Sequence, residues 1–400
     1  MNKKVLLLKD KEGIWTYLLE DDEVAEIHFD RAHDPKNRPH HLGNIYIGKV
    51  KKILSNLGAA FIEIAPGYEC YYDISLAKKA FFTEKKGKKP LTVGDELLVQ
   101  LSKDAVKTKA PTVSSNLSFT GYYSILTTGN TRMGVSAKIS KSRREEYKER
   151  LKHFENESYG IIIRTNGKDV PFSVIEAEIE SHIKAYEKLI SISSSRTCFS
   201  CVKAAPPGYI TNLKNIYAEG LSEIIVDDHE LFQDVQEYYR QQKPGAVDSI
   251  RFYKDHMLSL ASLYNTEKAL DRALGERIWL KNGAYLVIQP TEALTVIDVN
   301  SGKYSKQGTN GESALTINLE AAKVLAKQLR LRNLSGIIIV DFINMEDEVA
   351  TAELIIQLKL HLAKDPIQAS FVDMTALQLV EITRKKIRKP LAETLYYRQG

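Results

Sequence analysis

The apolar residues of one stretch, Leu294 to Met345, follow two different spacings along the chain. Leu294–Ile297 and Ile337–Val340 are short runs rich in β-branched residues, which is typical of buried strands. Between them, from about Ala314 to Leu331, apolar residues recur at helical spacing. The stretch is therefore expected to form a strand–helix–strand crossover unit.

An aspartate follows each of the two predicted strands, Asp298 after the first and Asp341 after the second. Strands joined by a crossover in one sheet run parallel, so their carboxyl ends meet at one edge. Two carboxylates that close favour a cation between them, and oxygen ligands suit Mg²⁺ or Mn²⁺. Asn300, two residues beyond Asp298, faces the same side of an extended segment. For either aspartate alone, an ordinary role as a turn residue stays open.

From Gly43 onward, short strand-like runs alternate with glycine-containing turns, which indicates a small barrel. Basic and aromatic residues are interleaved along these runs, among them Lys49, Phe61 and Tyr71. Exposed aromatic side chains beside a cationic groove can stack the bases of single-stranded nucleic acid. The alternative is that these aromatics fill the barrel core.

Three further groups of basic residues have two interpretations each. Arg164 and Thr165 end the predicted strand YGIIIRT, where they could hold a phosphate or form a structural salt bridge. A basic helix is expected at residues 384–389, where its charges either bind phosphates or face solvent. Lys327, Arg330 and Arg332 form the basic tail of the central helix; beside the two aspartates they favour a metal site, and taken alone they are expected on a solvated helix face.

Length and composition limit the class of protein. A chain of 400 residues suits two to four domains, and 43% hydrophobic with 27% charged residues is normal for a globular protein. The net charge of +5 permits a polyanionic partner without requiring one. Three cysteines argue against a disulfide framework, and no signal peptide or membrane-spanning run is visible, so we expect a cytoplasmic protein. The single CxxC, Cys198 and Cys201, is half of a structural zinc site, so zinc is not predicted.

Several motifs resemble the ribonuclease E/G family. IDVNSG, NLEAAKVLAKQLRLRNLSGIIIVDFINM and LVEITRKK resemble its catalytic core, GNIYIGKV with GAAFIEI and GYECYY its OB-fold barrel, and GVSAKI with IIIRT its 5′-sensor. The resemblance implies a multidomain α/β and α+β fold. Its expected parts are an RNase H-like subdomain (residues 1–40 and 209–275) split by an inserted OB-fold RNA-binding barrel (41–117) and a 5′-sensor subdomain (118–208), and then a DNase I-like catalytic subdomain (276–400).

The resemblance also implies roles for individual residues. Asp298 and Asp341 would hold the metal at the catalytic site, with Asn300 supporting the aspartate or the scissile phosphate. The RNA-binding residues of the barrel would be Phe61, Tyr71 and Lys109. The residues that sense the 5′-phosphate would be Gly121, Ile125, Lys138, Arg164 and Thr165. In three places the chain departs from the usual family pattern: Tyr71 replaces a common Phe, Lys138 a frequent Arg, and Asn344 the usual Asp, which removes a charge near the metal.

The activity implied by the resemblance is that of a Mg²⁺-dependent endoribonuclease that cuts single-stranded RNA and is stimulated by a 5′-monophosphate. Its expected roles are rRNA processing and mRNA turnover, and Mn²⁺ is an alternative metal. A homodimer is among the oligomeric states that the sequence leaves open, and no contact with a membrane is expected. The alternative function is a non-catalytic protein that binds single-stranded RNA through the barrel.

Overall fold

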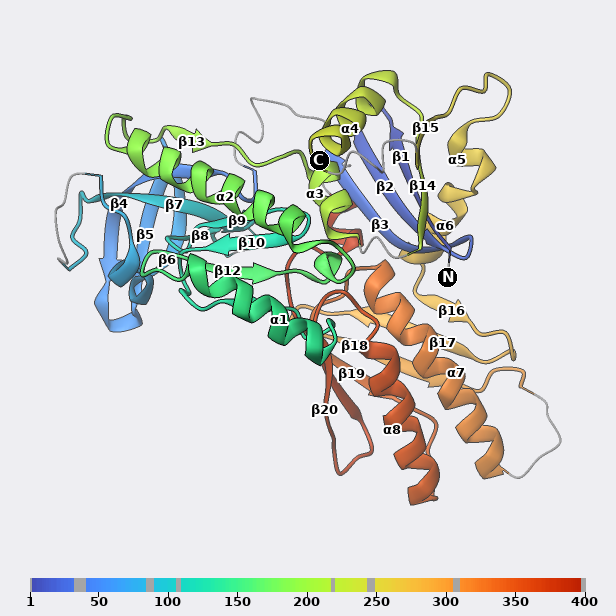
Figure 1. Ribbon diagram of the computed structural model, residues 1–400. Coiled ribbons are helices and arrows are strands. Elements are labelled where there is room, and N and C mark those ends of the chain that lie inside the picture. The colour runs from blue at the N-terminus through green and yellow to red at the C-terminus, as the bar shows by residue number, and fades with distance from the viewer. Residues whose placement is uncertain are drawn as a thin grey trace. The chain divides into compact units, whose positions relative to one another are not determined.

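The computed structural model describes residues 2–31, 41–83, 90–105, 109–216, 220–242, 249–304 and 310–396. The chain divides into two units, one of residues 1–32 with 220–400 and the other of residues 33–219. The second unit is thus inserted within the first. Both units combine sheets with helices, which confirms the expected mixed α/β class (Figure 1). No helix in the described ranges is long and apolar enough to cross a membrane.

The first strands of the chain share a sheet with strands that follow the inserted unit. The strand order is β15-β14-β1-β2-β3, and β1 pairs in parallel with β14 and antiparallel with β2. The apolar runs of β1 and β2 are almost wholly buried, which explains why they lack a clear alternation. The elements of this part are β1 (Lys3–Lys9), β2 (Gly13–Glu20), β3 (Glu23–Arg31), β14 (Leu221–Val226), β15 (Ile250–Phe252), α4 (His229–Gln242), α5 (Leu260–Leu263) and α6 (Thr266–Leu274).

A closed five-stranded barrel opens the second unit, and it confirms the barrel predicted from the short strands. Strand β4 pairs with both β5 and β7, which closes the order β4-β5-β6-β8-β7. At Gly48 a Cβ would come within 2.5 Å of Ile62 Cγ2, so only glycine lets these strands approach. The elements are β4 (Ile45–Leu54), η1 (Ser55–Leu57), β5 (Ala59–Ala65), β6 (Tyr68–Asp73), η2 (Ile74–Lys79), β7 (Glu96–Lys103), β8 (Thr112–Ser114) and β13 (Cys201–Lys203), which joins β4.

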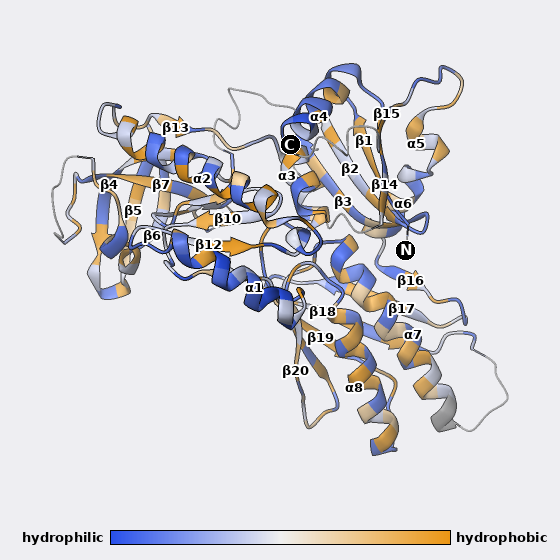
Figure 2. Cartoon of the chain, in the orientation of Figure 1, coloured by the Kyte–Doolittle hydropathy of each residue, from blue (hydrophilic) through white to orange (hydrophobic). Residues whose placement is uncertain are grey.

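A smaller four-stranded sheet follows in the same unit, in the order β11-β12-β10-β9. Its buried strand β12 and the long helix α2 share one apolar core with Tyr122 and Tyr147. Helix α1 is mostly hydrophilic along its length, as Figure 2 shows. The elements are β9 (Ser118–Thr120), β10 (Ser124–Thr127), β11 (Gly134–Val135), α1 (Lys141–Leu151), η3 (Lys152–Phe154), β12 (Gly160–Ile163), η4 (Thr165–Gly167), α2 (Phe172–Ser193) and α3 (Gly208–Asn215).

The predicted strand–helix–strand unit lies in a six-stranded sheet of order β16-β17-β18-β19-β21-β20. Helices α7 and α8 cover one face of this sheet, where Ile297, Ile338 and Leu325 belong to a single core (Figure 1). Asp298 and Asn300 of β18 and Asp341 of β19 lie on the opposite face. The elements are β16 (Arg277–Trp279), β17 (Tyr285–Pro290), β18 (Leu294–Asn300), α7 (Asn310–Leu331), β19 (Gly336–Asp341), α8 (Glu348–Leu362), β20 (Ala369–Met374), β21 (Val380–Arg384) and α9 (Leu391–Tyr396).

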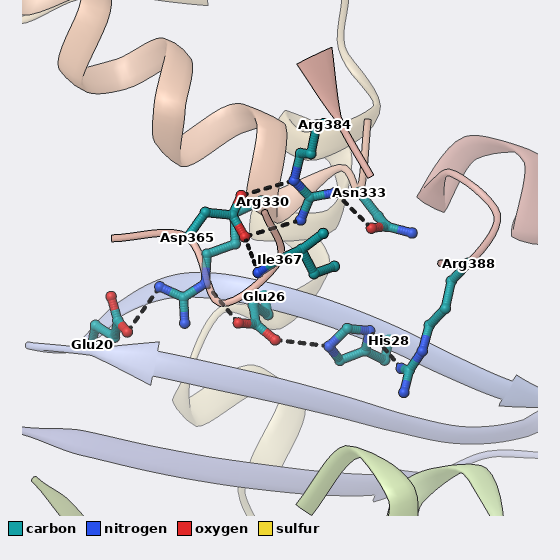
Figure 3. Close-up of polar contacts among 9 residues, drawn as sticks. All are labelled: Glu20, Glu26, His28, Arg330, Asn333, Asp365, Ile367, Arg384 and Arg388. Carbon is teal, nitrogen blue, oxygen red and sulfur yellow. Dashed lines mark hydrogen bonds and ion pairs between the residues drawn. The ribbon is translucent and has the colours of Figure 1, made fainter. Parts of the chain in front are cut away.

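The prediction of a basic helix at residues 384–389 is wrong, because Arg384 ends strand β21 and the next helix begins only at Leu391. The alternation of β21 turns Arg384 into the core, where it is 3% exposed. Its guanidinium donates to Asp365 Oδ2 at 2.8 Å and to Asn333 Oδ1 at 2.9 Å, as drawn in Figure 3. A buried charge needs such partners. Arg384 therefore fixes the turn before β19 and is not available to a phosphate.

The basic tail of α7 was expected to be solvated, and for Arg330 and Arg332 this is wrong. Arg330 donates through Nη1 to Glu20 at 2.9 Å and through Nε to Glu26 at 2.6 Å (Figure 3). Glu26 also contacts His28 Nε2 at 2.9 Å. Arg332 is buried and donates to backbone carbonyls, whereas the exposed Lys327 pairs with Glu23. Arg330 and Lys327 thus tie the crossover helix to the N-terminal sheet, and Arg332 ties its end to the carbonyls of Arg272 and Gly275.

Glu26 should make the stability of this contact depend on pH. Burial alone would raise the pKa of Glu26, but His28 and Arg330 outweigh it and lower the pKa from 4.5 to about 2. Ionised Glu26 therefore stabilises the fold fully above about pH 4.5, and this contribution is lost as the pH falls toward 2. Glu26→Gln should lower the free energy of unfolding at neutral pH, by on the order of 3 kcal/mol, and much less at about pH 3.

Urea denaturation at the two pH values measures this difference. Glu237→Gln is the matched control, because its ion pair with Arg240 is exposed on α4 and should contribute little. An equal loss of stability for Glu26→Gln at both pH values would contradict the assignment.

Candidate functional site

The two aspartates singled out in the sequence are direct neighbours across strands β18 and β19. These strands pair in parallel, and Asp298 is the register partner of Asp341. Neighbouring strands lie about 4.8 Å apart, and partners in register point to the same face of the sheet. Both side chains are exposed on the face opposite α7 and α8. Two carboxylates thus stand side by side on an open surface, as the crossover topology predicted.

Asn300 extends the polar site along β18. Its Nδ2 donates to Asp298 Oδ2 at 2.6 Å, which confirms the expectation that the two side chains share a face. This bond holds one carboxylate oxygen in place. The other Asp298 oxygen and the Asp341 carboxylate form no hydrogen bond with the residues that the structure describes. Asn300 can therefore orient Asp298 without filling the space between the two carboxylates.

The segment after Asp341 is held by a residue that sequence reasoning missed. Asn318 lies on α7 and is fully buried, and its amide both donates to Ile343 O at 2.8 Å and accepts from Ile343 N at 3.0 Å. A polar side chain at a helix position between apolar neighbours was the available signal. Asn344, the departure from the family pattern, is exposed next to this clamp. Asn318 thus sets the exit of the chain from the carboxylate pair.

The donor set suits one small hard cation. Mg²⁺ usually takes one or two carboxylates and keeps several waters, and Asp298 and Asp341 offer two exposed carboxylates with one orienting amide. Among the described residues, no group of three or more His, Cys, Asp or Glu side chains could hold a metal. The pair therefore does not resemble a cage made of protein ligands alone. It fits an open site in which water completes the coordination of the cation.

The barrel brings its two predicted RNA-stacking residues together. Phe61 on β5 and Tyr71 on β6 are antiparallel register partners, so their rings lie on the same face. Tyr71 is 38% exposed and Phe61 is half-buried, which places them at the surface and not in the barrel core. Tyr71 N also donates to Pro111 O at 2.8 Å, two residues beyond the exposed Lys109.

A carboxylate from helix α2 organises the loop between β9 and β10. Glu178 accepts from the backbone N–H groups of Tyr122, Tyr123 and Ser124 at 2.8, 3.0 and 2.7 Å. A Cβ at Gly121 would come within 2.4 Å of the Glu178 carboxylate, so the loop needs a glycine there. Ile125, the second residue of β10, pairs with Ile162 of β12. Glu178 was not singled out in the sequence, since nothing in a long charged helix distinguishes it.

Arg164 connects this loop to helix α3. Its Nη1 donates to Gly121 O at 2.5 Å and to Lys214 O at 3.1 Å, and its Nη2 donates to Asn215 Oδ1 at 2.8 Å. The structure thus brings Arg164 and Gly121 together. Arg164 also has hydrogen-bond partners within the protein, so a structural role for Arg164 stays open beside phosphate binding.

Thr165 and Lys138 meet through a serine that sequence reasoning missed. Ser136 Oγ lies 2.8 Å from Thr165 Oγ1 and accepts from Lys138 N at 3.3 Å. The Lys138 side chain is exposed. Two hydroxyls are therefore grouped at the end of strand β12, next to the backbone of Lys138. Ser136 belongs to the GVSAKI motif quoted above.

The neighbourhood of Arg164 is rich in cations that lack full hydration. Burial lowers the pKa of Lys214, Lys203 and Arg164 lower it further, and Glu178 opposes them. Burial also lowers the pKa of Lys203. Positive charges that disfavour one another would be stabilised by an added anion. This is a place where the inserted unit could accept a phosphate.

Comparison with known proteins relates these features to one family. A sequence model of the ribonuclease E/G family matches residues 118–387. The chain is 29% identical over 390 residues to ribonuclease G of Salmonella typhimurium strain SL1344 and to ribonuclease G of Escherichia coli strain K12, covering 93% of this chain and 77% of each of them. It is 29% identical over 378 residues to ribonuclease E of Nostoc sp. strain PCC 7120, covering 92% of this chain and 53% of that protein. The match to the family model extends over more than half of the chain, which therefore belongs to the ribonuclease E/G family.

Proposed function

We propose that this protein is an endoribonuclease that cuts single-stranded RNA. Asp298 and Asp341 would form its active site by holding a divalent cation, Mg²⁺ or Mn²⁺. Membership of the ribonuclease E/G family supports the class of reaction. The observation that carries the location is the register pairing of the two aspartates on parallel strands. Two exposed carboxylates repel the phosphates of RNA, so a substrate can approach them only when a cation neutralises the pair.

Asp298 and Asp341 are the residues that would hold the cation, and Asn300 fixes the Asp298 carboxylate so that it presents its other oxygen. A bound divalent cation would polarise a scissile phosphate and lower the pKa of an attacking water. An RNA strand would lie across β18 and β19, where both carboxylates are exposed. Hydrolysis of this kind yields a 5′-phosphate and a 3′-hydroxyl.

Two surfaces of the inserted unit would bind the rest of the substrate. The ring pair of Phe61 and Tyr71 would stack bases, with Lys109 contacting the backbone, as aromatic platforms of OB-folds do. The group formed by Arg164, Thr165 and Lys138 would bind a 5′-monophosphate, supported by the destabilised cations around Lys214. Stimulation of cleavage by a 5′-monophosphate follows from this assignment.

Removing either carboxylate should abolish cleavage. Asp298→Asn and Asp341→Asn remove a negative charge while keeping the size of the side chain, so the fold and RNA binding should persist. Asp373→Asn is the matched control, because this exposed aspartate belongs to the same sheet but lies on β20. The measurement is turnover of a labelled single-stranded RNA with Mg²⁺ or with EDTA. Wild-type turnover in either variant would refute the site, and binding without any cleavage by the wild type would favour the non-catalytic alternative.

Stacking on the barrel should dominate the affinity for single-stranded RNA. Phe61→Ala and Tyr71→Ala should each weaken binding about 5- to 150-fold, because stacking contributes roughly 1–3 kcal/mol per base. Val93→Ala, which shortens an exposed apolar side chain of the barrel, should leave the affinity unchanged. Titrations and thermal melts are run on the same samples. A loss of thermal stability without a loss of affinity would show that the two rings serve the barrel itself.

The 5′-sensor assignment predicts a preference between substrates that differ only at the 5′ end. Wild-type protein should cut 5′-monophosphorylated RNA faster than 5′-hydroxyl RNA of the same sequence. Arg164→Ala should erase that preference and leave the slower rate unchanged. Asn215→Ala removes a partner of Arg164 and keeps the guanidinium, so the preference should survive. If Arg164→Ala slows both substrates equally, its contacts to Gly121 and Lys214 are its main role and the sensor assignment fails.

A further inference from the structure

One tryptophan on the open face of the catalytic sheet is exposed to an unusual degree. The chain has two tryptophans, of which Trp15 is 5% exposed and Trp279 is 59% exposed. Tryptophan is on average among the more buried residues, so a mostly exposed indole suggests a binding surface. Trp279 lies on the edge strand β16, and its ring centroid is 5.0 Å from that of the half-buried Tyr285 on β17.

The register of the sheet connects this aromatic pair to the proposed active site. Trp279 pairs with Tyr285, and Tyr285 pairs with Asn300. Asn300 in turn donates to Asp298. Register partners share a face, so the two rings and Asn300 form one row across three strands. With strands about 4.8 Å apart, the indole lies about 10 Å from Asn300, within reach of a nucleotide next to the scissile phosphate.

A cation accompanies the aromatic pair in the neighbouring row. Arg277 pairs with Val287, which pairs with Asp298, so this row ends at the carboxylate pair. The Arg277 guanidinium lies over the Tyr285 ring at 4.6 Å from its centroid. Arg277 is exposed and forms no ion pair with the residues that the structure describes. It therefore offers a positive charge beside the Tyr285 ring, two strands away from Asp298.

We propose that Trp279, Tyr285 and Arg277 form a stacking subsite for one nucleotide of the RNA strand, next to the phosphate that is cut. The indole stacks on the base, Tyr285 supports the indole from the sheet, and Arg277 contacts the nucleotide's phosphate. The inference rests on the proposed function, since it places the substrate beside Asp298 and Asp341. Charge favours this occupant: Arg277 complements a polyanion, and a base has a flat apolar face that matches a ring.

The subsite would add a local requirement for a base near the cleavage position. Stacking at the barrel depends on Phe61 and Tyr71 and acts on RNA at large. A subsite on β16 would instead act on the base at a fixed distance from the cut. Loss of that single base should therefore affect cleavage in the same way as loss of the indole, and the two losses should not add.

A scan with abasic RNA tests this directly. A single-stranded oligoribonucleotide with one known cleavage position is prepared as a series in which one nucleotide at a time lacks its base. For the wild type, one abasic position adjacent to the cut should lower the cleavage rate about 5- to 150-fold. Trp279→Ala should cut the intact RNA slower by a similar factor and be indifferent to the base at that position. Trp279→Phe keeps a ring and should retain much of the dependence.

The control variant is Ile356→Ala, which truncates a side chain of similar exposure, 57%, on the outer side of α8. It should behave as the wild type throughout the scan. Arg277→Ala should weaken binding of the intact RNA and reduce its salt dependence, because one phosphate contact is lost. Tryptophan emission gives a readout that does not depend on cleavage. Adding RNA in EDTA should quench the wild-type emission, and the response should disappear in Trp279→Phe.

Three outcomes would overturn the subsite. The first is an abasic scan in which the wild type and Trp279→Ala respond alike at every position. The second is RNA binding in EDTA without a change in tryptophan emission. The third is a changed oligomeric state of Trp279→Ala in sedimentation with an unchanged scan, which would make the indole a contact between copies of the chain. If the wild type fails to cut any RNA, the proposed function fails, whereas the emission experiment still tests the subsite separately.

Discussion

The parallel pairing of β18 with β19 is the constraint on which the proposed active site depends. Parallel neighbours need a crossover, and α7 supplies it by burying an apolar stripe that includes Ala321, Leu325 and Leu329 on the sheet. Because α7 and α8 pack on the same face, the opposite face stays open at the carboxyl ends of the strands. The register of the two strands sets Asp298 beside Asp341. Asn318 holds the backbone of Ile343 and so fixes the path of the chain after Asp341.

Charge is distributed in two different ways in this molecule. Cations of the first unit that look available in the sequence, such as Arg330 and Arg384, are paired with carboxylates and hold the sheet and its helices together. In the inserted unit, Lys214 and Lys203 are partly buried, and burial, together with repulsion from Lys203 and Arg164, lowers the pKa of Lys214. The first arrangement stabilises a fold, whereas the second favours an anion. Net charge alone, +5 over the whole chain, does not distinguish between them.

Periodicity and topology were enough to predict the crossover unit, the carboxylate pair and the barrel, because each follows from local spacing and a short connection. Arg384 could not be predicted in the same way. Its run of basic neighbours favours a helix, whereas Val380–Arg384 pairs with β19 and β20 as a strand and buries Arg384 against Asp365. The partners of Arg330 are about three hundred positions away, so no local pattern reveals them. Trp279 became informative only when the register placed it in a row with Asn300.

The central claim is that Asp298 and Asp341 together bind one divalent cation on the open face of the sheet. Electron paramagnetic resonance of bound Mn²⁺ tests it most directly, with RNA absent. The account predicts that Mn²⁺ binds to the wild-type protein and to Asp373→Asn, and that binding is lost in Asp298→Asn and in Asp341→Asn alike. Mn²⁺ binding that survives in either of these two variants with unchanged affinity would contradict it.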